Sequence, residues 1–425
     1  MPQTVHISRN NADFSFKIKD QVELWTTQEQ YPLPLKGDAF ADAIYDALMH
    51  PVDYPPVTGG VVPGDAVAIV IDAELPNPEV AVTGVLRTLA DLELSRIDVV
   101  VPESATEETR AAIRSVLTSE IELTVHSGKS RDDLRYLAAN EAADPIYLNR
   151  RIVDADLVIP VFAARQSDPL MTGSGFCPVF PSLSDYRSQA RARIDASDLT
   201  SSTHQRRGAA DDEATRVGWL LGLQWLVSVE MTADGKPGDV YVGTSDTIAT
   251  RAREVESENE MPGTADVVIA CVEGGSQQQS LTNLLRAALV ARGHASTDSS
   301  IVLVTDLDEL GVIDEYAGEA YDDESYESET IEDGQREPNR EPVVETVVLS
   351  STDHARQMLS LLINDIDSTH RYLLLSNCRE EEAESFGFGF VKDAEALSRL
   401  VDGNDSCIVI RHAQLASAHA RSAIE

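Results

Sequence analysis

The chain has 425 residues, of which 42% are hydrophobic and 25% are charged, so it can bury the cores of two or three domains. Its 72 acidic and 34 basic residues give a net charge of −38, and this field repels nucleic acid and anionic lipid. The four cysteines form no CxxC pair, and the sequence has neither a signal segment nor an apolar run of about 18 residues. We therefore expect a cytoplasmic protein without nucleic-acid or membrane partners.

Apolar runs alternate with helical patterns in the first half of the chain. The expected strands are 66–72, 97–101, 123–126 and 155–162, and the expected helices between them are 77–92 and 106–117. Further on, the pattern predicts a helix over 213–226, a hairpin of 227–231 with 239–242 around Asp234-Gly235, and a helix over 247–257. Strands that are apolar throughout and separated by helices indicate a parallel sheet covered on both faces.

A second α/β unit is expected from residue 263 onward. Its strands are predicted at 265–272, 300–305, 372–376 and 407–410, and its helices at 280–292, 353–364 and 393–400. Residues 314–342 interrupt this unit with a strongly acidic stretch that has too little apolar content to order itself, so we expect a disordered surface insertion. The predicted domains are 1–262 and 263–425.

The loop that follows the strand at 155–162 is rich in Gly, Pro and Ser over residues 167–186. In a doubly wound sheet, such loops at the carboxyl ends of strands form the ligand crevice. Asp168 lies in this loop, and Asp72 ends the first strand of the sheet. Basic clusters at 187–193 and 204–207 are interpreted either as solvated faces or as a rim that binds anions.

Several segments, in this order along the chain, resemble the nickel-dependent lactate racemase (LarA-like) family. They are Tyr31 to Lys36, Pro63 to Asp65, Asp72 with Pro76 and Pro78, Pro145 to Arg150 running into Ala155 to Ile159, Ala265 to Ile269 with Gly274-Gly275, and Phe386 to Phe388. The resemblance covers nearly the whole chain apart from the acidic insertion. It implies an α/β fold of two domains, each with a mostly parallel sheet flanked by helices, and a ligand crevice between them.

In that family a nickel-pincer nucleotide is tethered to a lysine, a histidine holds the nickel, and two more histidines act as acid and base. This chain resembles the family at Asp72 but has Glu74-Leu75 in place of a Thr-Arg pair. The family's first proton-transfer histidine is missing from Pro102 to Ala105. His126 matches another family histidine, and we interpret it as structural.

The remaining family positions also differ. Gly173, Ser174 and Gly175 partly preserve a glycine loop that in the family carries the second proton-transfer histidine, which is missing here. Cys177 falls at the tether position, and Ala192 or Arg193 falls at the position of the nickel ligand. Arg286 or Ala287 falls where the second domain of the family has a lysine.

Three functional hypotheses follow. The first is a catalytically degenerate lactate racemase-like protein, because each missing proton-transfer group alone is worth about 10² to 10⁴ in rate. The second is a divergent racemase or epimerase of a 2-hydroxy acid with a nickel-pincer or related cofactor. Its candidate catalytic residues are Asp72 and Asp168, and its candidate cofactor-binding residues are Gly173, Ser174, Gly175, Cys177, Arg187, Arg191, Arg193 and Arg286.

The third hypothesis is an unrelated α/β protein that binds a nucleotide or phosphate. The Gly173–Gly175 segment is neither a P-loop nor a dinucleotide fingerprint, because no Gly-Lys-Ser/Thr and no third glycine follow it. All three hypotheses place a ligand in the interdomain crevice, and a small anion is the partner expected there.

Overall fold

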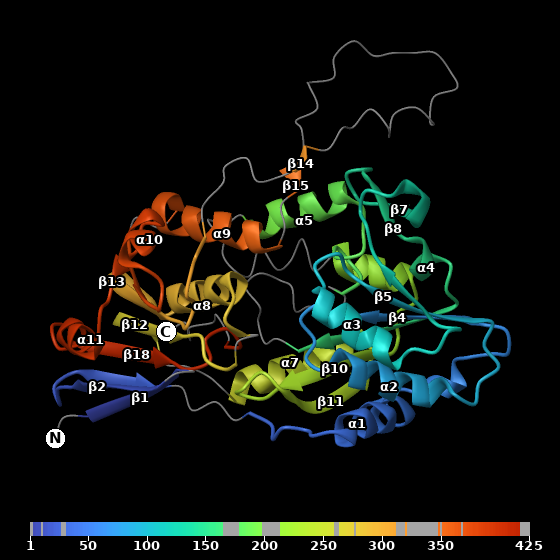
Figure 1. Ribbon diagram of the computed structural model, residues 1–425, viewed down its shortest axis with the longest axis horizontal. Helices are drawn as coiled ribbons and strands as arrows, with labels where there is room; N and C mark the ends of the chain where they lie inside the picture. Colours follow the sequence, from blue (N-terminus) through green and yellow to red (C-terminus); the bar gives the residue numbers. More distant parts are fainter. Residues whose placement is uncertain are drawn as a thin grey trace, which may run out of the picture.

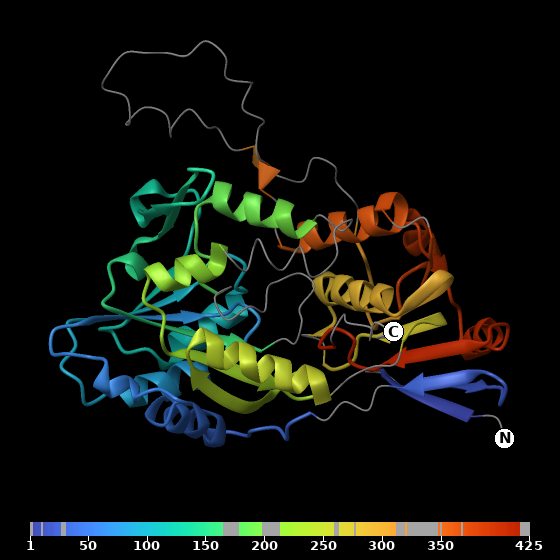
Figure 2. The same cartoon turned by 180° about the vertical axis from the view of Figure 1, so that it is seen from behind.

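The structure is a computed structural model that describes residues 3–9, 12–26, 31–164, 178–197, 213–258, 263–275, 278–311, 319–320, 347–348, 351–366 and 369–416. Two six-stranded sheets flanked by helices occupy opposite ends of the long axis of the molecule (Figures 1 and 2). The predicted α/β class with two mostly parallel sheets is therefore confirmed.

The first sheet forms from residues 66–243. In spatial order it contains β11 (Pro237–Gly243), β10 (Leu226–Met231), β9 (Leu157–Ala163), β4 (Ala66–Ile71), β5 (Arg96–Val101) and β6 (Glu122–Val125). All neighbours pair in parallel except β10 and β11, which form the hairpin predicted around Asp234-Gly235.

Helices cover both faces of this sheet because its central strands are apolar on both sides. All six residues of β4 are buried. Val67, Ile69 and Ile71 face a core shared with α1 (Asp38–Met49), α2 (Pro78–Leu89) and α3 (Glu107–Val116), whereas Ala68 and Val70 face the opposite core. That second core includes α4 (Arg150–Val153), the helix at 213–220 and α7 (Ser245–Glu258).

The second sheet has the same layered construction. In spatial order it contains β17 (Gly389–Phe390), β16 (Arg371–Leu375), β13 (Ala295–Val304), β12 (Ala265–Cys271), β18 (Ser406–Ile410) and β3 (Glu23–Thr26), and every neighbouring pair is parallel. One face packs against α8 (Leu281–Gly293), α9 (Ser351–Leu361) and α10 (Glu380–Ser385), and the other against α11 (Ala394–Val401). The π-helix Leu362–Ile366 continues α9.

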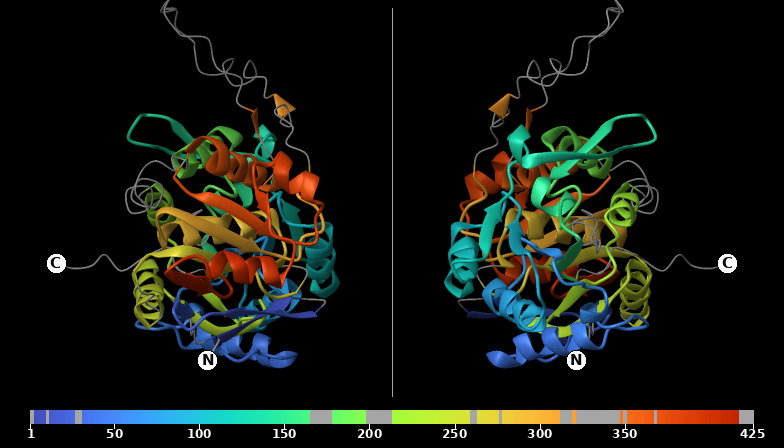
Figure 3. Two further views of the ribbon diagram at one scale, coloured as in Figure 1. Left: turned by 90° about the vertical axis from the view of Figure 1, so that its left-hand side faces the viewer. Right: turned by 90° about the vertical axis from the view of Figure 1, so that its right-hand side faces the viewer.

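The amino-terminal segment packs with the second sheet. The hairpin of β1 (Gln3–Arg9) and β2 (Ala12–Ile18) lies beside β18 and α11 in all views (Figures 1, 2 and 3) and buries Val5, Ile7, Phe16 and Ile18 in the core of that sheet. Strand β3 then pairs with β18. The predicted domain bounds, 1–262 and 263–425, stay a prediction, but this segment packs with the second sheet because β3 finds its pairing partner more than 370 residues further along the chain.

Smaller elements complete the described chain. The strands β7 (Leu134–Ala139) and β8 (Pro145–Asn149) form a hairpin, α5 (Tyr186–Ser197) follows the loop after β9, and short 3₁₀ turns lie at Val57–Gly59 and Arg131–Asp133. Of the predicted insertion 314–342, the structure describes only β14 (Glu319–Ala320), which pairs with β15 (Val347–Val348). Among the described residues, no helix has both the length and the apolar content that a membrane span requires.

Candidate functional site

Each of the two sheets has a topological switch point, where consecutive connections leave in opposite directions. In the first sheet β4 lies between β5 and β9, and in the second sheet β12 lies between β13 and β18. In α/β proteins the carboxyl ends of such strands are where ligands usually bind, because the loops there diverge. Functional side chains are therefore expected in the loops that directly follow β4, β9, β12 and β18.

Contacts between these loops bring the two carboxyl edges together. Glu74, which follows β4, forms an ion pair with Arg286 of α8. Gly235, in the turn between β10 and β11, lies so close to Gln278 that a Cβ at Gly235 would come within 2.5 Å of its amide nitrogen. The crevice expected between the sheets stays a prediction, but any ligand held there would meet side chains from both edges.

Asp72 lies at the first switch point and links its two strands. Its carboxylate accepts hydrogen bonds from the backbone N–H of Glu74 at 3.1 Å and of Ala163, the last residue of β9, at 3.3 Å. The backbone N–H of Asp72 donates to Val161 in β9. These bonds give Asp72 a role in holding the ends of β4 and β9, and a catalytic role for it stays a prediction.

Arg286 is the most deeply buried charged candidate, with only 1% of its side chain exposed. Its Nη1 donates to Glu74 Oε2 at 3.1 Å and to Asn283 Oδ1 at 2.7 Å. Glu74 is 42% exposed, so the buried cation is matched by a carboxylate that reaches the surface. Arg286, which the family resemblance identified as a candidate cation, is therefore paired with an acidic side chain of the same chain.

Of the two basic clusters expected to form an anion-binding rim, the one at 187–193 lies on α5, and the one at 204–207 lies outside the described residues. Asp185 caps the start of this helix by accepting from the backbone N–H of Arg187 and of Ser188. Arg191 donates to Glu213 at 3.0 Å, and another of its nitrogens lies 3.9 Å from Asp144. For Arg193 only the backbone is described. These contacts tie α5 to neighbouring segments, and cofactor binding by these arginines stays a prediction.

The glycine-rich loop lies outside the described residues. Asp168, Gly173, Ser174, Gly175 and Cys177 all fall in 165–177, between the end of β9 and residue 178. Their predicted catalytic and cofactor-binding roles stay predictions.

His126 follows β6 and is 1% exposed. The Ser184 carbonyl can only accept, so Nε2 carries the proton and donates to it at 2.8 Å, while Nδ1 accepts from the Asn149 amide at 3.2 Å. Burial lowers the pKa of His126 below its ordinary value of 6.5, and the hydrogen bond to Ser184 opposes that shift. With both nitrogens engaged and the ring neutral, these contacts fit the expected structural role.

The sequence prediction missed a cluster at the second switch point. Glu273 follows β12, is 1% exposed, and accepts three bonds from the Arg411 guanidinium at 2.8, 2.9 and 3.1 Å. The backbone N–H of Ser8 also donates to it at 2.8 Å. The His412 Nε2 lies 3.3 Å from the same carboxylate. The signal that could have found it is Arg411-His412, directly after the apolar strand at 407–410, together with Glu273, directly after a second apolar strand.

Electrostatics within this cluster keep the arginine charged and the imidazole neutral. Hydrogen bonding to Glu273 raises the pKa of Arg411 above its ordinary value of 12.5, although burial opposes this effect. Burial lowers the pKa of His412 below 6.5, Arg411 lowers it further, and Glu273 and Asp234 act in the opposite direction. Since the burial effect is the largest, His412 is a neutral base at neutral pH.

The described residues do not fit a nickel site. No group of three or more His, Cys, Asp or Glu side chains in this part of the chain could hold a metal ion. The thiols of Cys271, Cys378 and Cys407 are free and buried, and burial raises the pKa of each, that of Cys407 to about 12. Thiolates are the form that ligates metal, so these cysteines are poor ligands.

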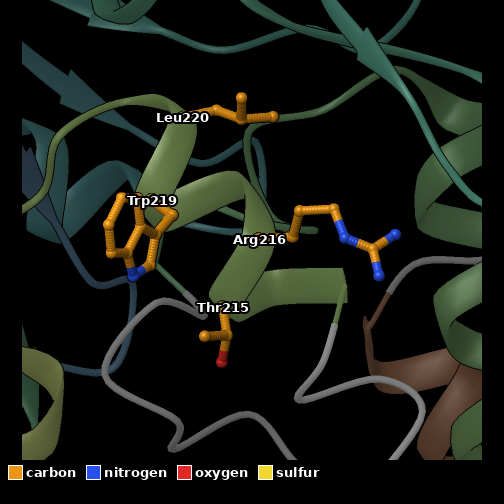
Figure 4. A pocket seen from close by; sticks show the side chains of 4 residues that line it. All are labelled: Thr215, Arg216, Trp219 and Leu220. Carbon is orange, nitrogen blue, oxygen red and sulfur yellow. The ribbon is translucent and has the colours of Figure 1, made fainter.

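A surface depression lies elsewhere, on the helix at 213–220. Figure 4 shows its lining, the side chains of Thr215, Arg216, Trp219 and Leu220, which all leave one helix. Trp219 is 81% exposed, and Arg216 forms an ion pair with Glu141. Within the described part of the chain its lining comes from one helix, which encloses little of a ligand, so it is a weaker candidate than the strand ends.

Comparison with known proteins agrees with the fold. Residues 10–168 match the family described as lactate racemase N-terminal domain. The lactate racemase apoprotein from Thermoanaerobacterium thermosaccharolyticum is similar over 97% of this chain and 99% of its own, with a TM-score of 0.73 and 12% identity. A structural-genomics protein from Thermotoga maritima is similar over 88% of this chain and 96% of its own, with a TM-score of 0.56 and 11% identity.

No curated protein matches the chain. The family match covers the segment that builds most of the first sheet, and the structural likeness extends over both sheets. Residues 10–168 therefore belong to the family described as lactate racemase N-terminal domain, and the chain as a whole shares the fold of the lactate racemase apoprotein.

Proposed function

We propose that this protein is a catalytically degenerate member of its family, which uses the inherited scaffold to bind a small molecule without nickel-pincer catalysis. The observation that carries the proposal is the ion pair between Glu74 and Arg286. The family resemblance places a Thr-Arg pair, whose arginine binds the substrate carboxylate, where this chain has Glu74-Leu75. It also places a lysine near Arg286. In this chain the pair reads Glu74-Leu75, and the Glu74 carboxylate forms an ion pair with Arg286.

The consequence for an anionic substrate can be estimated. Two carboxylates about 4 Å apart repel each other by roughly 4 kcal/mol at an effective dielectric constant of about 20. Glu74 is 42% exposed, and solvent screening reduces this figure to roughly 1–2 kcal/mol, or about a tenfold loss of affinity. A carboxylate that approached Arg286 would also have to displace Glu74 from it. The small anionic ligand expected from the sequence would therefore bind Arg286 poorly in the wild-type chain.

Substitution of Glu74 tests this argument directly. Glu74→Gln should increase affinity for lactate about tenfold, because the Glu74 carboxylate would no longer repel the ligand or compete with it for Arg286. Isothermal titration calorimetry on the full chain measures the change. Glu79→Gln is the matched control, because it removes one negative charge in the first turn of α2, five residues further on. Equal affinity in the wild type and in Glu74→Gln would contradict the argument.

The loss of nickel chemistry has its own test. The full chain would be co-expressed with the enzymes that make the pincer cofactor, and then measured by native mass spectrometry, elemental analysis and a chiral lactate assay. A lactate racemase loaded in parallel is the positive control. We expect an unmodified mass, no stoichiometric nickel and no racemisation. A nickel-nucleotide adduct on this chain would overturn the proposal.

The second candidate is a divergent racemase or epimerase of a 2-hydroxy acid. It is favoured by the pair of Glu273 and His412 at the second switch point, since a divergent enzyme needs a substitute for the missing proton-transfer histidines. Cys177 is its candidate tether. An adduct that is present on the wild type and lost on Cys177→Ala would select this candidate over the degenerate one.

A further inference from the structure

The cluster of Glu273, Arg411 and His412 has no role in the proposed degenerate protein, although a divergent enzyme could use its histidine for proton transfer. It lies at the switch point of the second sheet, where β12 and β18 end side by side. The backbone oxygen of Asp234, from the β10–β11 turn of the first sheet, would lie 3.5 Å from a Cβ on Gly274, the residue after Glu273. The cluster is therefore close to the place where the two sheet edges meet.

The contacts of Glu273 fix which nitrogen of His412 carries the proton. The side-chain oxygens of Glu273 accept from the Arg411 guanidinium and from the Ser8 backbone N–H, so they act as hydrogen-bond acceptors. His412 Nε2, at 3.3 Å from the same carboxylate, can approach it favourably only as a donor. The neutral ring then carries its lone pair on Nδ1, as in histidines that a carboxylate orients for ligand binding or proton transfer.

Two polar atoms beside this cluster have no hydrogen-bond partner among the described residues. They are His412 Nδ1 and the hydroxyl oxygen of Tyr31, and both are buried. The two rings are in contact, with centroids 5.1 Å apart and an angle of 77° between their planes. A buried polar atom without a partner costs about 1–3 kcal/mol, so two such atoms on rings that are in contact indicate that something else completes their hydrogen bonds.

The backbone at His412 supports the same conclusion. Its φ angle is +48°, a left-handed conformation that is uncommon for residues other than glycine, although histidine adopts it more often than most. Such conformations cost free energy and persist where the surrounding structure requires a side chain in a particular place, often at binding sites. Here the conformation places the imidazole against Glu273 and Tyr31.

We propose that His412 and Tyr31, with Glu273 as the positioning residue, form a binding site for the hydroxyl group of a small organic molecule. A hydroxyl can donate to the Nδ1 lone pair and accept from the tyrosine O–H, so it satisfies both atoms at once. A carboxylate can only accept, and it would face both the lone pair and the nearby Glu273 and Asp234. The proposal is independent of the proposed function, because it holds whether or not a nickel nucleotide is bound.

Histidine-selective ¹⁵N labelling of the full chain and long-range NMR spectra of the imidazole rings provide the test. His412→Asn assigns the signal, and asparagine tolerates the left-handed backbone, so the fold should persist. In the free protein we expect Nε2 protonated and Nδ1 unprotonated at neutral pH. A His412 ring protonated on Nδ1 instead would overturn the proposal.

The probes are lactate and propionate, which differ by one hydroxyl, and glycerol, which is uncharged. We expect lactate and glycerol to shift the His412 Nδ1 signal and propionate to leave it unchanged. Tyr31→Phe should weaken lactate and glycerol binding about fivefold, the effect of losing one neutral hydrogen bond. If neither hydroxyl compound shifts the signal, or if propionate shifts it equally, the proposal is wrong. Nickel content is not part of this readout, so its failure is distinct from failure of the proposed function.

Discussion

Removing Arg411 should destabilise the protein more than removing the charge of its partner, Glu273. The reason is their unequal burial: 1% of the Glu273 side chain is exposed, compared with 32% of the Arg411 side chain. In Arg411→Met the carboxylate stays buried after losing three bonds to the guanidinium. In Glu273→Gln the guanidinium can turn toward water, and the amide oxygen can still accept from Ser8.

The magnitudes follow from this difference. Leaving one partner of a buried ion pair unpaired lowers the free energy of unfolding by about 3–5 kcal/mol. The contacts of Ser8 and His412 with Glu273 would offset part of that loss, so we expect a decrease of about 3 kcal/mol for Arg411→Met. Losing the charge-assisted bonds in Glu273→Gln should cost about 1–2 kcal/mol. The double variant should be more stable than Arg411→Met alone, because it no longer contains a buried charge.

Urea denaturation followed by far-UV circular dichroism measures the free energies, and hydrogen exchange in β12 and β18 shows whether the loss is local. Arg399→Met is the control, because Arg399 pairs with Glu395 at 3.9 Å in an exposed position on α11 and should contribute less than about 0.5 kcal/mol. The reasoning is refuted if Arg411→Met costs no more than Glu273→Gln, or if the double variant is the least stable of the three.

Acidification should destabilise the protein through His126, because burial lowers the pKa of this histidine in the folded state. Its contribution to the free energy of unfolding is therefore complete above about pH 6.5 and is lost as the pH falls toward the folded pKa. Urea denaturation at several pH values should show a smaller loss for His126→Gln than for the wild type, whereas the exposed His50→Gln should follow the wild type. Gly84→Ala should cost about 1–2 kcal/mol in the same assay, because the new Cβ would lie 2.8 Å from a backbone oxygen of α1; Gly59→Ala, which meets nothing within 4 Å, should be neutral. Cys407 should react with a thiol reagent far more slowly in the native state than in urea, since burial raises its pKa to about 12; rapid native labelling, detected by peptide mass mapping, would contradict this.

The elements that the sequence predicted are those whose signal is local. The run at 66–72 is apolar throughout because both faces of β4 are covered, and this pattern is visible without any knowledge of its neighbours. The helix predicted at 106–117 begins as expected, with Thr106 accepting from the backbone N–H of Thr109. Such features depend on residues a few positions apart.

The elements that the sequence did not reveal depend on distant partners. Strand β3 has four residues, of which only Leu24 is half-buried, and it is a strand because β18 pairs with it. The candidate site shows the same division. Arg286 was identified from its position, but its pairing with Glu74 joins residues 212 positions apart and required the structure. Glu273 and His412 also come from different strands, so no local motif contains both.

The pairing of β3 with β18 has a consequence for how the chain is completed during synthesis. The first sheet uses only residues 66–243, so it can form while the carboxyl-terminal part is still being made. The hairpin β1–β2 and strand β3 leave the ribosome before the first sheet, yet their partners at 394–410 leave it only after that sheet is complete. Strand β3 must therefore wait, without its pairing partner, until β18 has been made. The charge of Glu23, which is exposed at the start of this strand, would help to keep that edge from pairing with other chains.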